Sequence, residues 1–354
     1  MSASDPDQDR QTVLDAFDKQ IGWCEKLASP FTARLLTILR DDIAAGGASA
    51  ELALGWPGDP IADALPLRMA GAMHALALTG SAPALVPRYP PSAAPVEQLR
   101  PVVLDVVREH HSAIHAFLVS PPQTNEVGRS GVLVGGFLEI AKETSLPLRC
   151  LEIGASAGLN TIWDRYHYRL GAVGWGDPRS PVSLAPSWEG PSPPVDAPLR
   201  VIERHACDIA PIDLEDPAQR LRLRAYIWAD QRERLSRLES AIDLARAHGP
   251  RVDQADAADW VRTTLREPAA SSAMVLYHSI MWQYMPPETQ ASIRASLDEA
   301  GGRATSAAPL AWLRFELLDS LSQPELRMTL WPGGHDVRLA VAHPHGSSVQ
   351  WSSL

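Results

Sequence analysis

Apolar residues recur at every third or fourth position in the first third of the chain, which is typical of helices that bury one face. This periodicity covers residues 11–45 and 65–78, and it predicts one long helix over 96–119. Clusters of glycine and proline separate these stretches and mark turns. We therefore predict an N-terminal helical region over residues 1–125.

Beyond residue 126 the pattern changes, because short apolar runs alternate with amphipathic helical stretches. Such runs, bounded by turn residues, are typical of buried strands. Their alternation with helices predicts a mostly parallel sheet with helices on both faces, and ligands of such sheets bind at the carboxyl ends of the strands. The predicted strands are residues 148–153, 199–202, 225–229, 251–256, 273–277, 310–317, 328–331 and 337–342.

A glycine-containing turn, Gly154-Ala155-Ser156-Ala157-Gly158, follows the strand predicted at 148–153. Its two glycines let the backbone turn sharply and let a ligand approach main-chain N–H groups. With Glu152 in front, the turn is typical of a nucleotide-binding site that opens a Rossmann-like domain. The same letters also match G-x-S-x-G, the nucleophile elbow of serine hydrolases, with Ser156 at its tip.

Polar residues stand at the ends of successive predicted strands: Glu152, Asp230, Asp256 and His278. Asp230, after the strand predicted at 225–229, is placed to accept hydrogen bonds from both hydroxyls of a ribose. Asp256, at the end of the strand predicted at 251–256, is placed to accept one from the exocyclic amine of adenine. The neighbouring backbone N–H, that of Ala257, then reaches a ring nitrogen.

These stretches resemble the class I S-adenosylmethionine-dependent methyltransferases at residues 151–160, 228–231 and 254–260. Residues 121–130, PPQTNEVGRS, together with 151–160, LEIGASAGLN, also resemble a bacterial family of uncharacterised proteins. The first resemblance implies a Rossmann-like methyltransferase domain over 126–354 and S-adenosylmethionine as the cofactor. The cofactor-binding residues that we predict from it are Arg129, Glu152, Gly154, Ala155, Gly158, Asn160, Asp230, Gln231, Asp256 and Ala257.

The sequence departs from the methyltransferase pattern in two places. Ser156 stands where the usual turn has its middle glycine. Asp230 also follows Glu152 at a far greater distance than the roughly 20 residues that are usual, by analogy with the dinucleotide fold. A loop-rich insertion at about 163–223 accounts for this spacing, and it makes Glu203 a rival candidate for the ribose acid.

The serine hydrolase alternative pairs Ser156 with a downstream acid, Asp230 or Asp256, and then a histidine, which is His278, His335 or His343. In hydrolases, however, the elbow follows several strands, whereas residues 11–143 are predicted to be helices and loops. No glycine-rich oxyanion segment precedes it either. The cofactor turn is therefore favoured, and a non-catalytic nucleotide-binding module is the third alternative.

His278 and Tyr284 are the predicted catalytic residues, because both lie where methyl transfer would occur. An imidazole titrates near neutral pH and suits the removal of a proton from the acceptor. A purely structural hydrogen bond explains His278 equally well. His111 and His115 lie one helical turn apart but have no third ligand at a recognisable spacing, so we predict no metal site.

The composition narrows the possible partners. The chain has 354 residues, of which 45% are hydrophobic, and its net charge of −10 argues against binding bulk nucleic acid through phosphate contacts. No apolar run is long enough to cross a membrane, and three isolated cysteines suit a reducing compartment. We expect a cytoplasmic enzyme that acts on a small-molecule acceptor. The acceptor and the oligomeric state are left open.

Overall fold

The computed structural model describes residues 6–92, 94–318 and 322–352, and these form two compact units. The smaller unit holds the chain up to Thr124 and the segment Asp216–Ser236. The larger unit holds Asn125–Glu215 and the chain from Arg237 onwards. The segment Asp216–Ser236, which the sequence places in the second domain, thus belongs to the smaller unit.

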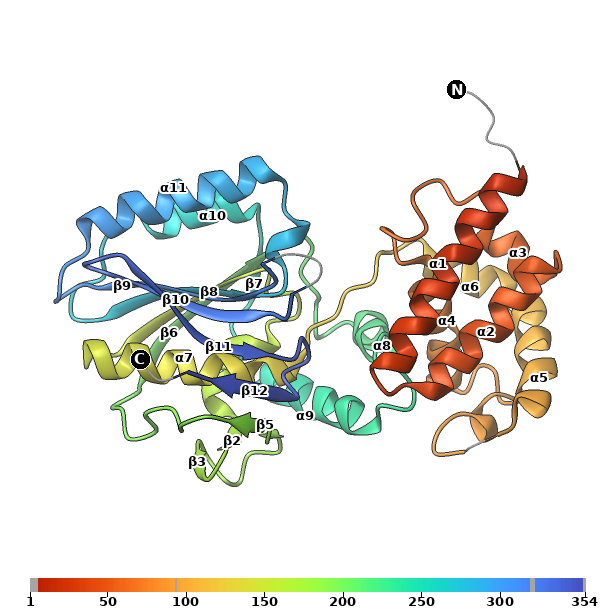
Figure 1. Cartoon of the computed structure of the whole chain (residues 1–354), viewed down its shortest axis with the longest axis horizontal. Coiled ribbons are helices and arrows are strands. Elements are labelled where there is room, and N and C mark those ends of the chain that lie inside the picture. The colour runs from red at the N-terminus through yellow and green to blue at the C-terminus, as the bar shows by residue number, and fades with distance from the viewer. Residues whose placement is uncertain (1–5, 93, 319–321, 353–354) are drawn as a thin grey trace. The chain divides into compact units, whose positions relative to one another are not determined.

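The smaller unit is helical, as predicted, and encloses one apolar core (Figure 1). The helix predicted over residues 96–119 is wrong in one respect, because it breaks at His110, whose φ and ψ are −109° and 20°. The helices of the smaller unit are α1 (Pro6–Lys26), α2 (Pro30–Ala44), α3 (Ala48–Ala53), α4 (Leu65–Thr79), η1 (Val86–Arg88), α5 (Val96–Glu109), α6 (His111–Leu118) and α8 (Pro217–Ala225).

The strand predicted at 225–229 is wrong: helix α8 ends there, and the chain continues as a turn. Its apolar residues pack on the helical core instead. Asp230 consequently does not follow a strand. Its carboxylate accepts hydrogen bonds from the Ser29 hydroxyl and, at 2.8 Å, from the Phe31 N–H, so it satisfies the start of α2. Gln231 also faces this unit, since its amide donates to the Leu27 carbonyl at 3.1 Å.

The larger unit is built on a nine-stranded, mostly parallel sheet in the order β5-β12-β11-β10-β9-β8-β1-β6-β7. Strands β7, β6, β1, β8 and β9 are mutually parallel, and β10, β11 and β12 continue as an antiparallel meander. The strands are β1 (Leu148–Ile153), β5 (Ser187–Glu189), β6 (Val201–Asp208), β7 (Val252–Gln254), β8 (Ala273–Ser279), β9 (Leu310–Glu316), β10 (Glu325–Trp331), β11 (His335–Ala342) and β12 (Ser348–Trp351).

Helices cover both faces of this sheet, which confirms the predicted mixed α/β architecture (Figure 1). Helix α7 (Ser130–Thr144) lies on one face, and its approach is close because a β-carbon at Gly136 would lie 2.4 Å from Leu313 Cδ1. Helices α10 (Ala257–Thr264) and α11 (Pro287–Arg303) lie on the other face. Helix α9 (Arg232–His248) precedes β7.

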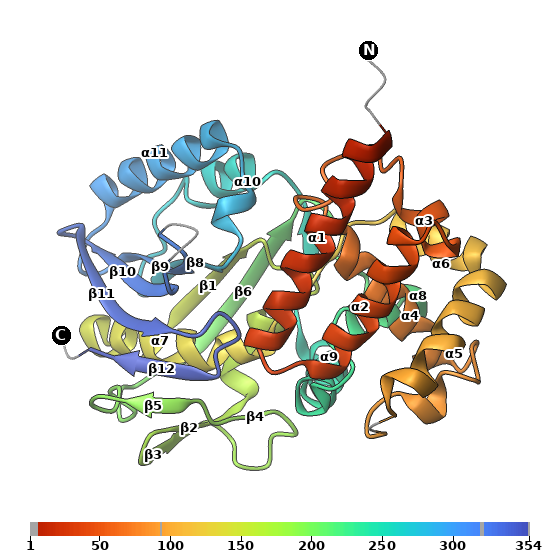
Figure 2. The same cartoon turned by 45° about the vertical axis from the view of Figure 1, so that its right-hand side comes forward.

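The order of the strands reverses at β1. The chain runs from β1 to β6 and β7 on one side and then returns to β8 and β9 on the other, so that β1 lies between β6 and β8 (Figure 2). In open α/β sheets, ligands bind in the crevice that this reversal leaves at the carboxyl ends of the strands. The predicted insertion holds a small sheet of β2 (His167–Leu170), β3 (Val173–Trp175) and β4 (Ser183–Leu184).

Replacing Asp230 with alanine should destabilise the helical unit by about 1–2 kcal/mol, because the start of α2 loses its acceptor. Thermal unfolding followed by circular dichroism measures the change. Asp230→Asn keeps one acceptor oxygen and should lose less. An unaltered melting temperature for Asp230→Ala would contradict the capping role.

Candidate functional site

The turn after β1 contains three left-handed residues within five positions. Gly154, Ser156 and Gly158 have φ values of +65°, +54° and +74°. This conformation is uncommon for a serine, and therefore the turn needs external support. The support comes from Asp208, whose Oδ2 accepts the Ser156 N–H at 2.8 Å, and from Ile212, whose N–H donates to the Ser156 carbonyl at 3.1 Å.

Asp208 is the acid at the carboxyl end of β6, the strand next to β1. It occupies the position in the sheet that we assigned to Asp230 from the sequence. Glu203 is not an alternative, since it lies near the amino end of β6 and pairs with Arg149 at 2.9 Å. Asp208 is not apparent from the sequence, because charged residues interrupt the apolar run of β6 and the pattern predicts a strand that ends at Ile202.

Glu152 is buried at the end of β1, with an exposed fraction of 2%. Its Oε2 lies 3.2 Å from the Tyr277 hydroxyl. Burial raises the pKa of Glu152 to about 8; the Tyr277 hydrogen bond opposes this, the negative charge of Asp208 adds to it, and Arg129 opposes it. At neutral pH the carboxyl group is therefore mainly protonated.

Residues 124–129, which we call the TNEVGR stretch, pack together with Ser130 around the glycine turn. Asn125 Oδ1 accepts the Leu159 N–H at 2.8 Å, and Asn160 Nδ2 donates to the Glu126 carbonyl at 3.2 Å. The Ser130 hydroxyl donates to Asn160 Oδ1 at 2.6 Å. These bonds explain why so many polar side chains stand between apolar segments: they satisfy buried backbone and amide groups.

The loop after β8 lies over the same turn. A β-carbon at Gly154 would lie 2.6 Å from Met281 Cε, so the Met281 side chain covers this glycine. Ile280, just before it, has φ +46°, which is a strained conformation for a β-branched residue. Arg129 Nη1 donates to the Ser279 carbonyl at 2.8 Å and thereby joins this loop to the TNEVGR stretch.

His278, predicted as a proton acceptor, does not reach the surface. Its exposed fraction is 0%, and Nδ1 lies 2.6 Å from Glu316 Oε1 while Nε2 accepts the Trp312 indole N–H at 3.0 Å. Both ring nitrogens are thus occupied. Glu316 also accepts the backbone N–H groups of Met281 and Trp282, at 3.2 and 3.3 Å. The sequence offered no signal for Glu316, which lies at the end of β9.

Of the remaining predicted residues, Ala155 is buried, and its N–H donates to the Cys207 carbonyl at 3.1 Å, whereas Tyr284, Asp256 and Ala257 are accessible. Tyr284, at the end of η4 (Trp282–Tyr284), has an exposed fraction of 77%. Asp256 caps α10, because its Oδ1 accepts the N–H groups of Ala258 and Asp259 at 2.9 and 3.2 Å. Within the described residues its Oδ2 accepts no hydrogen bond. Ala257 is the first residue of that helix, and its carbonyl and N–H lie beside the cap.

The Ser156 hydroxyl is buried and, among the residues that the structure describes, has no hydrogen-bond partner. A nucleophilic serine requires a base within hydrogen-bond distance. His278, the first histidine proposed for this role, is bonded to Glu316 and Trp312 instead. The geometry thus lacks the Ser–His contact that the hydrolase alternative needs.

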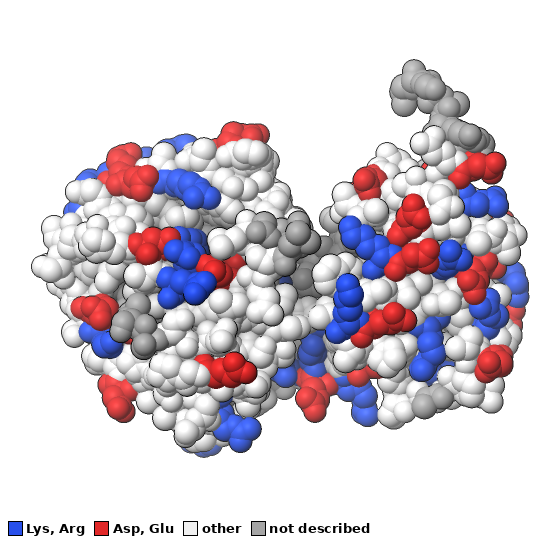
Figure 3. Space-filling view, viewed as in Figure 1, with Lys and Arg blue, Asp and Glu red and all other residues white. Residues whose placement is uncertain are grey.

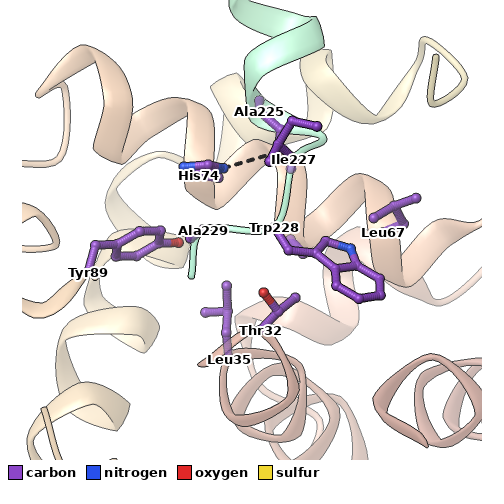
Figure 4. A pocket seen from close by; sticks show the side chains of 11 residues that line it. Thr32, Leu35, Leu67, His74, Tyr89, Ala225, Ile227, Trp228 and Ala229 are labelled. Carbon is purple, nitrogen blue, oxygen red and sulfur yellow. Dashed lines mark hydrogen bonds between the residues drawn. The ribbon is translucent and has the colours of Figure 1, made fainter. Parts of the chain in front are cut away.

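A small cavity of about 10 Å³ lies within the helical unit, between Thr32, His74, Tyr89 and Trp228 (Figure 4). Its volume suits about one water molecule. The Tyr89 hydroxyl has no partner in the described structure, whereas His74 Nδ1 lies 3.2 Å from the Ala225 carbonyl. Burial lowers the pKa of His74 to about 4. This cavity is too small for a nucleoside cofactor.

The described residues contain no group of three or more histidine, cysteine, aspartate or glutamate side chains arranged to hold a metal ion. Of the helices described, none has the length and apolar character needed to cross a membrane.

The unfolding free energy of Glu152→Gln, minus that of the natural protein, should increase as the pH rises. Because the folded carboxyl holds its proton more tightly than the unfolded one, its contribution to stability is complete below about pH 4.5 and is lost as the pH rises to about 8. Glutamine stays neutral throughout. The difference in unfolding free energy should grow by up to about 1.4 kcal/mol per pH unit in this window.

Urea unfolding at a series of pH values measures this difference. Glu203→Gln is a matched control: hydrogen bonding to His205 lowers the pKa of Glu203, so its difference should vary only below about pH 4.5, with the opposite sign, and should stay constant between pH 4.5 and 8. A difference for Glu152→Gln that does not vary with pH would contradict a raised pKa.

Comparison with known proteins identifies a family but no function. The model of a family described as "Uncharacterized protein conserved in bacteria (DUF2332)" matches residues 14–351. No curated protein matches the chain, and no solved structure does. The family match spans nearly the whole chain and confirms the predicted resemblance to an uncharacterised bacterial family. The chain belongs to the bacterial family DUF2332.

Proposed function

We propose that the protein binds S-adenosylmethionine at the carboxyl ends of β1, β6 and β7 and transfers its methyl group to a small-molecule acceptor. One observation carries the proposal: the glycine turn lies at the point where the strand order reverses, between β1 and β8. The parallel order β7-β6-β1-β8-β9 corresponds to 3-2-1-4-5 in a doubly wound nucleotide-binding sheet.

The acids at three neighbouring strand ends support this proposal. In it, Asp208 replaces Asp230 as the residue that accepts hydrogen bonds from the ribose hydroxyls. Its Oδ2 already accepts the Ser156 N–H and its Oδ1 the Ala210 N–H at 2.9 Å, so the ribose would use the second acceptor site of each carboxylate oxygen. Asp256 offers its Oδ2 to the adenine amine, and the Ala257 N–H faces a ring nitrogen. Asp208 is the last residue of β6, and Asp256 follows β7 by two residues, so both lie at the edge of the sheet where the glycine turn lies.

The glycine turn itself suits the rest of the cofactor. The buried Ser156 hydroxyl has no partner among the described residues, and a polar atom of a ligand would satisfy it. Glu152, which is protonated at neutral pH in the free protein, would release its proton to hold an ammonium group. Met281 would have to turn away from Gly154, and its three rotatable bonds make that movement cheap.

The bound cofactor supplies an electrophilic methyl group on its sulfonium, and the residues of the chain hold the reactants. Methyl transfer depends chiefly on bringing two reactants together in the correct geometry. Of the two predicted catalytic residues, Tyr284 is still a candidate, because its exposed hydroxyl is available to an acceptor. His278 and Glu316 position the loop that carries it.

Calorimetric titration with S-adenosylmethionine and S-adenosylhomocysteine tests the cofactor. Asp256→Asn should weaken binding about tenfold or more, because the new amide nitrogen cannot accept from the adenine amine while Oδ1 still caps α10. Asp216→Asn is a matched control: Asp216 caps α8 in the same manner, at 2.8 Å from the Ala218 N–H, but lies in the helical unit.

If neither S-adenosylmethionine nor S-adenosylhomocysteine binds at millimolar concentration, the cofactor proposal is wrong. Binding that is equal in Asp256→Asn and the natural protein would move the adenine site elsewhere. Binding without turnover across a panel of acceptors would indicate the non-catalytic module.

The hydrolase alternative keeps one supporting observation: Ser156 is left-handed, and its hydroxyl has no hydrogen-bond partner in the part of the chain that the structure describes. A fluorophosphonate probe labels an activated serine, and we expect no labelling, because no described base contacts Ser156. Labelling that disappears in Ser156→Ala would reverse this choice of function.

A further inference from the structure

Three arginines lie in register on neighbouring strands of the sheet, and a fourth lies on α11. Arg314, Arg327 and Arg338 lie on the neighbouring strands β9, β10 and β11, and Arg294 lies on α11. In Figure 3, blue and red atoms lie together over the part of the larger unit where Figure 1 draws β9 and β10. We call these four residues the arginine face.

Two carboxylates are shared among three of these arginines. Asp336 pairs with Arg314 at 2.8 Å and with Arg327 at 3.0 Å. Glu325 pairs with Arg327 at 2.8 Å and with Arg338 at 3.0 Å. With Arg294 included, the arginine face carries more positive than negative charge, although the whole chain has a net charge of −10.

Arg294 is held in place without a carboxylate. Its guanidinium carbon lies 5.2 Å from the centroid of the Trp282 ring and 5.9 Å from that of Trp312. Within the described part of the chain, no carboxylate lies within ion-pair distance of the Arg294 guanidinium, and this includes Asp298, one helical turn further along α11. Cation–π contacts orient a guanidinium but leave its N–H groups available for an acceptor.

Arg314 shows that the arginines are close enough to affect one another. Its side chain is 16% exposed and lies 4.1 Å from the Trp312 centroid. Burial lowers the pKa of Arg314, and the positive charges of Arg327 and Arg294 add to this, while Asp336 opposes it. Arg294 is exposed, so its N–H groups face solvent, and a negatively charged ligand there would reduce the repulsion among the three positive charges.

We infer that the arginine face binds an oxyanion, the carboxylate or phosphate group of a small molecule, with Arg294 as its direct ligand. Planar guanidinium groups suit such anions, because they donate two parallel hydrogen bonds.

The position of this face links it to the glycine turn. Trp282, under Arg294, directly follows Met281, which covers Gly154. If the proposed function is correct, the methyl acceptor is therefore an anionic small molecule whose charged group binds at Arg294. This second statement rests on the proposed function, whereas oxyanion binding does not.

Titration of the full chain with inorganic phosphate and with benzoate tests the inference. Both are followed by tryptophan fluorescence and calorimetry at constant ionic strength, with chloride as the replacement anion. We expect at least one probe to bind saturably. Because Trp282 lies under Arg294, this binding should change the tryptophan fluorescence. Phosphate alone would identify a phosphate-bearing ligand, and benzoate alone a carboxylate.

Arg294→Gln should weaken that binding at least about tenfold, because the charged donor is lost. Arg294→Lys keeps the charge but not the planar pair of donors and should bind with intermediate affinity. Arg262→Gln is the matched control: it removes an exposed arginine that pairs with Asp259 on α10 and should bind as the natural protein does.

No saturable binding of either probe at millimolar concentration would overturn the inference, as would equal affinities for Arg294→Gln and Arg262→Gln. S-adenosylhomocysteine is titrated in parallel. Its binding without anion binding would refute the arginine face alone. Anion binding without it would leave the arginine face intact and refute the cofactor.

Discussion

The structure depends on one constraint: the turn after β1 is buried, and its backbone N–H groups must find acceptors inside the protein. Buried main-chain groups without partners are costly, so each requires a hydrogen bond. Asp208 supplies one acceptor, to Ser156, and Asn125 supplies another, to Leu159. These bonds attach the turn to the end of β6 on one side and to the TNEVGR stretch on the other.

The loop after β8 meets the same requirement by a different route. Glu316 at the end of β9 accepts backbone N–H groups of Met281 and Trp282 and faces His278. Several bonds to one buried carboxylate hold the loop firmly, and this explains how Ile280 is kept at a strained φ of +46°. The same loop carries Met281 to Gly154 and Trp282 to Arg294, so it connects the glycine turn with the arginine face.

Polar residues of the same type thus have different roles in this chain. Asp230 and Asp256 both cap helices, but Asp230 uses both oxygens for that purpose, whereas the bonds at Asp256 use one. His278 is enclosed by aromatic rings and a carboxylate, and its nitrogens serve the structure. The chemistry available at the end of each strand is therefore decided by the groups that each side chain has already bound.

Much of the architecture followed from the sequence by itself. Helical periodicity before residue 125 and the later alternation of strands with helices depend on local burial patterns, and most of these elements are present in the structure. The glycine turn was also recognisable, since few residues other than glycine tolerate a left-handed backbone. The sequence did not reveal which acid follows β6, because Asp208 ends a strand interrupted by charges while the apolar run before Asp230 resembled a strand. Only the tertiary structure decided that the run before Asp230 packs among helices, that Asp208 supports the turn, and that His278 is buried against Glu316. These outcomes depend on contacts between residues far apart in the chain, and local periodicity carries no information about such contacts.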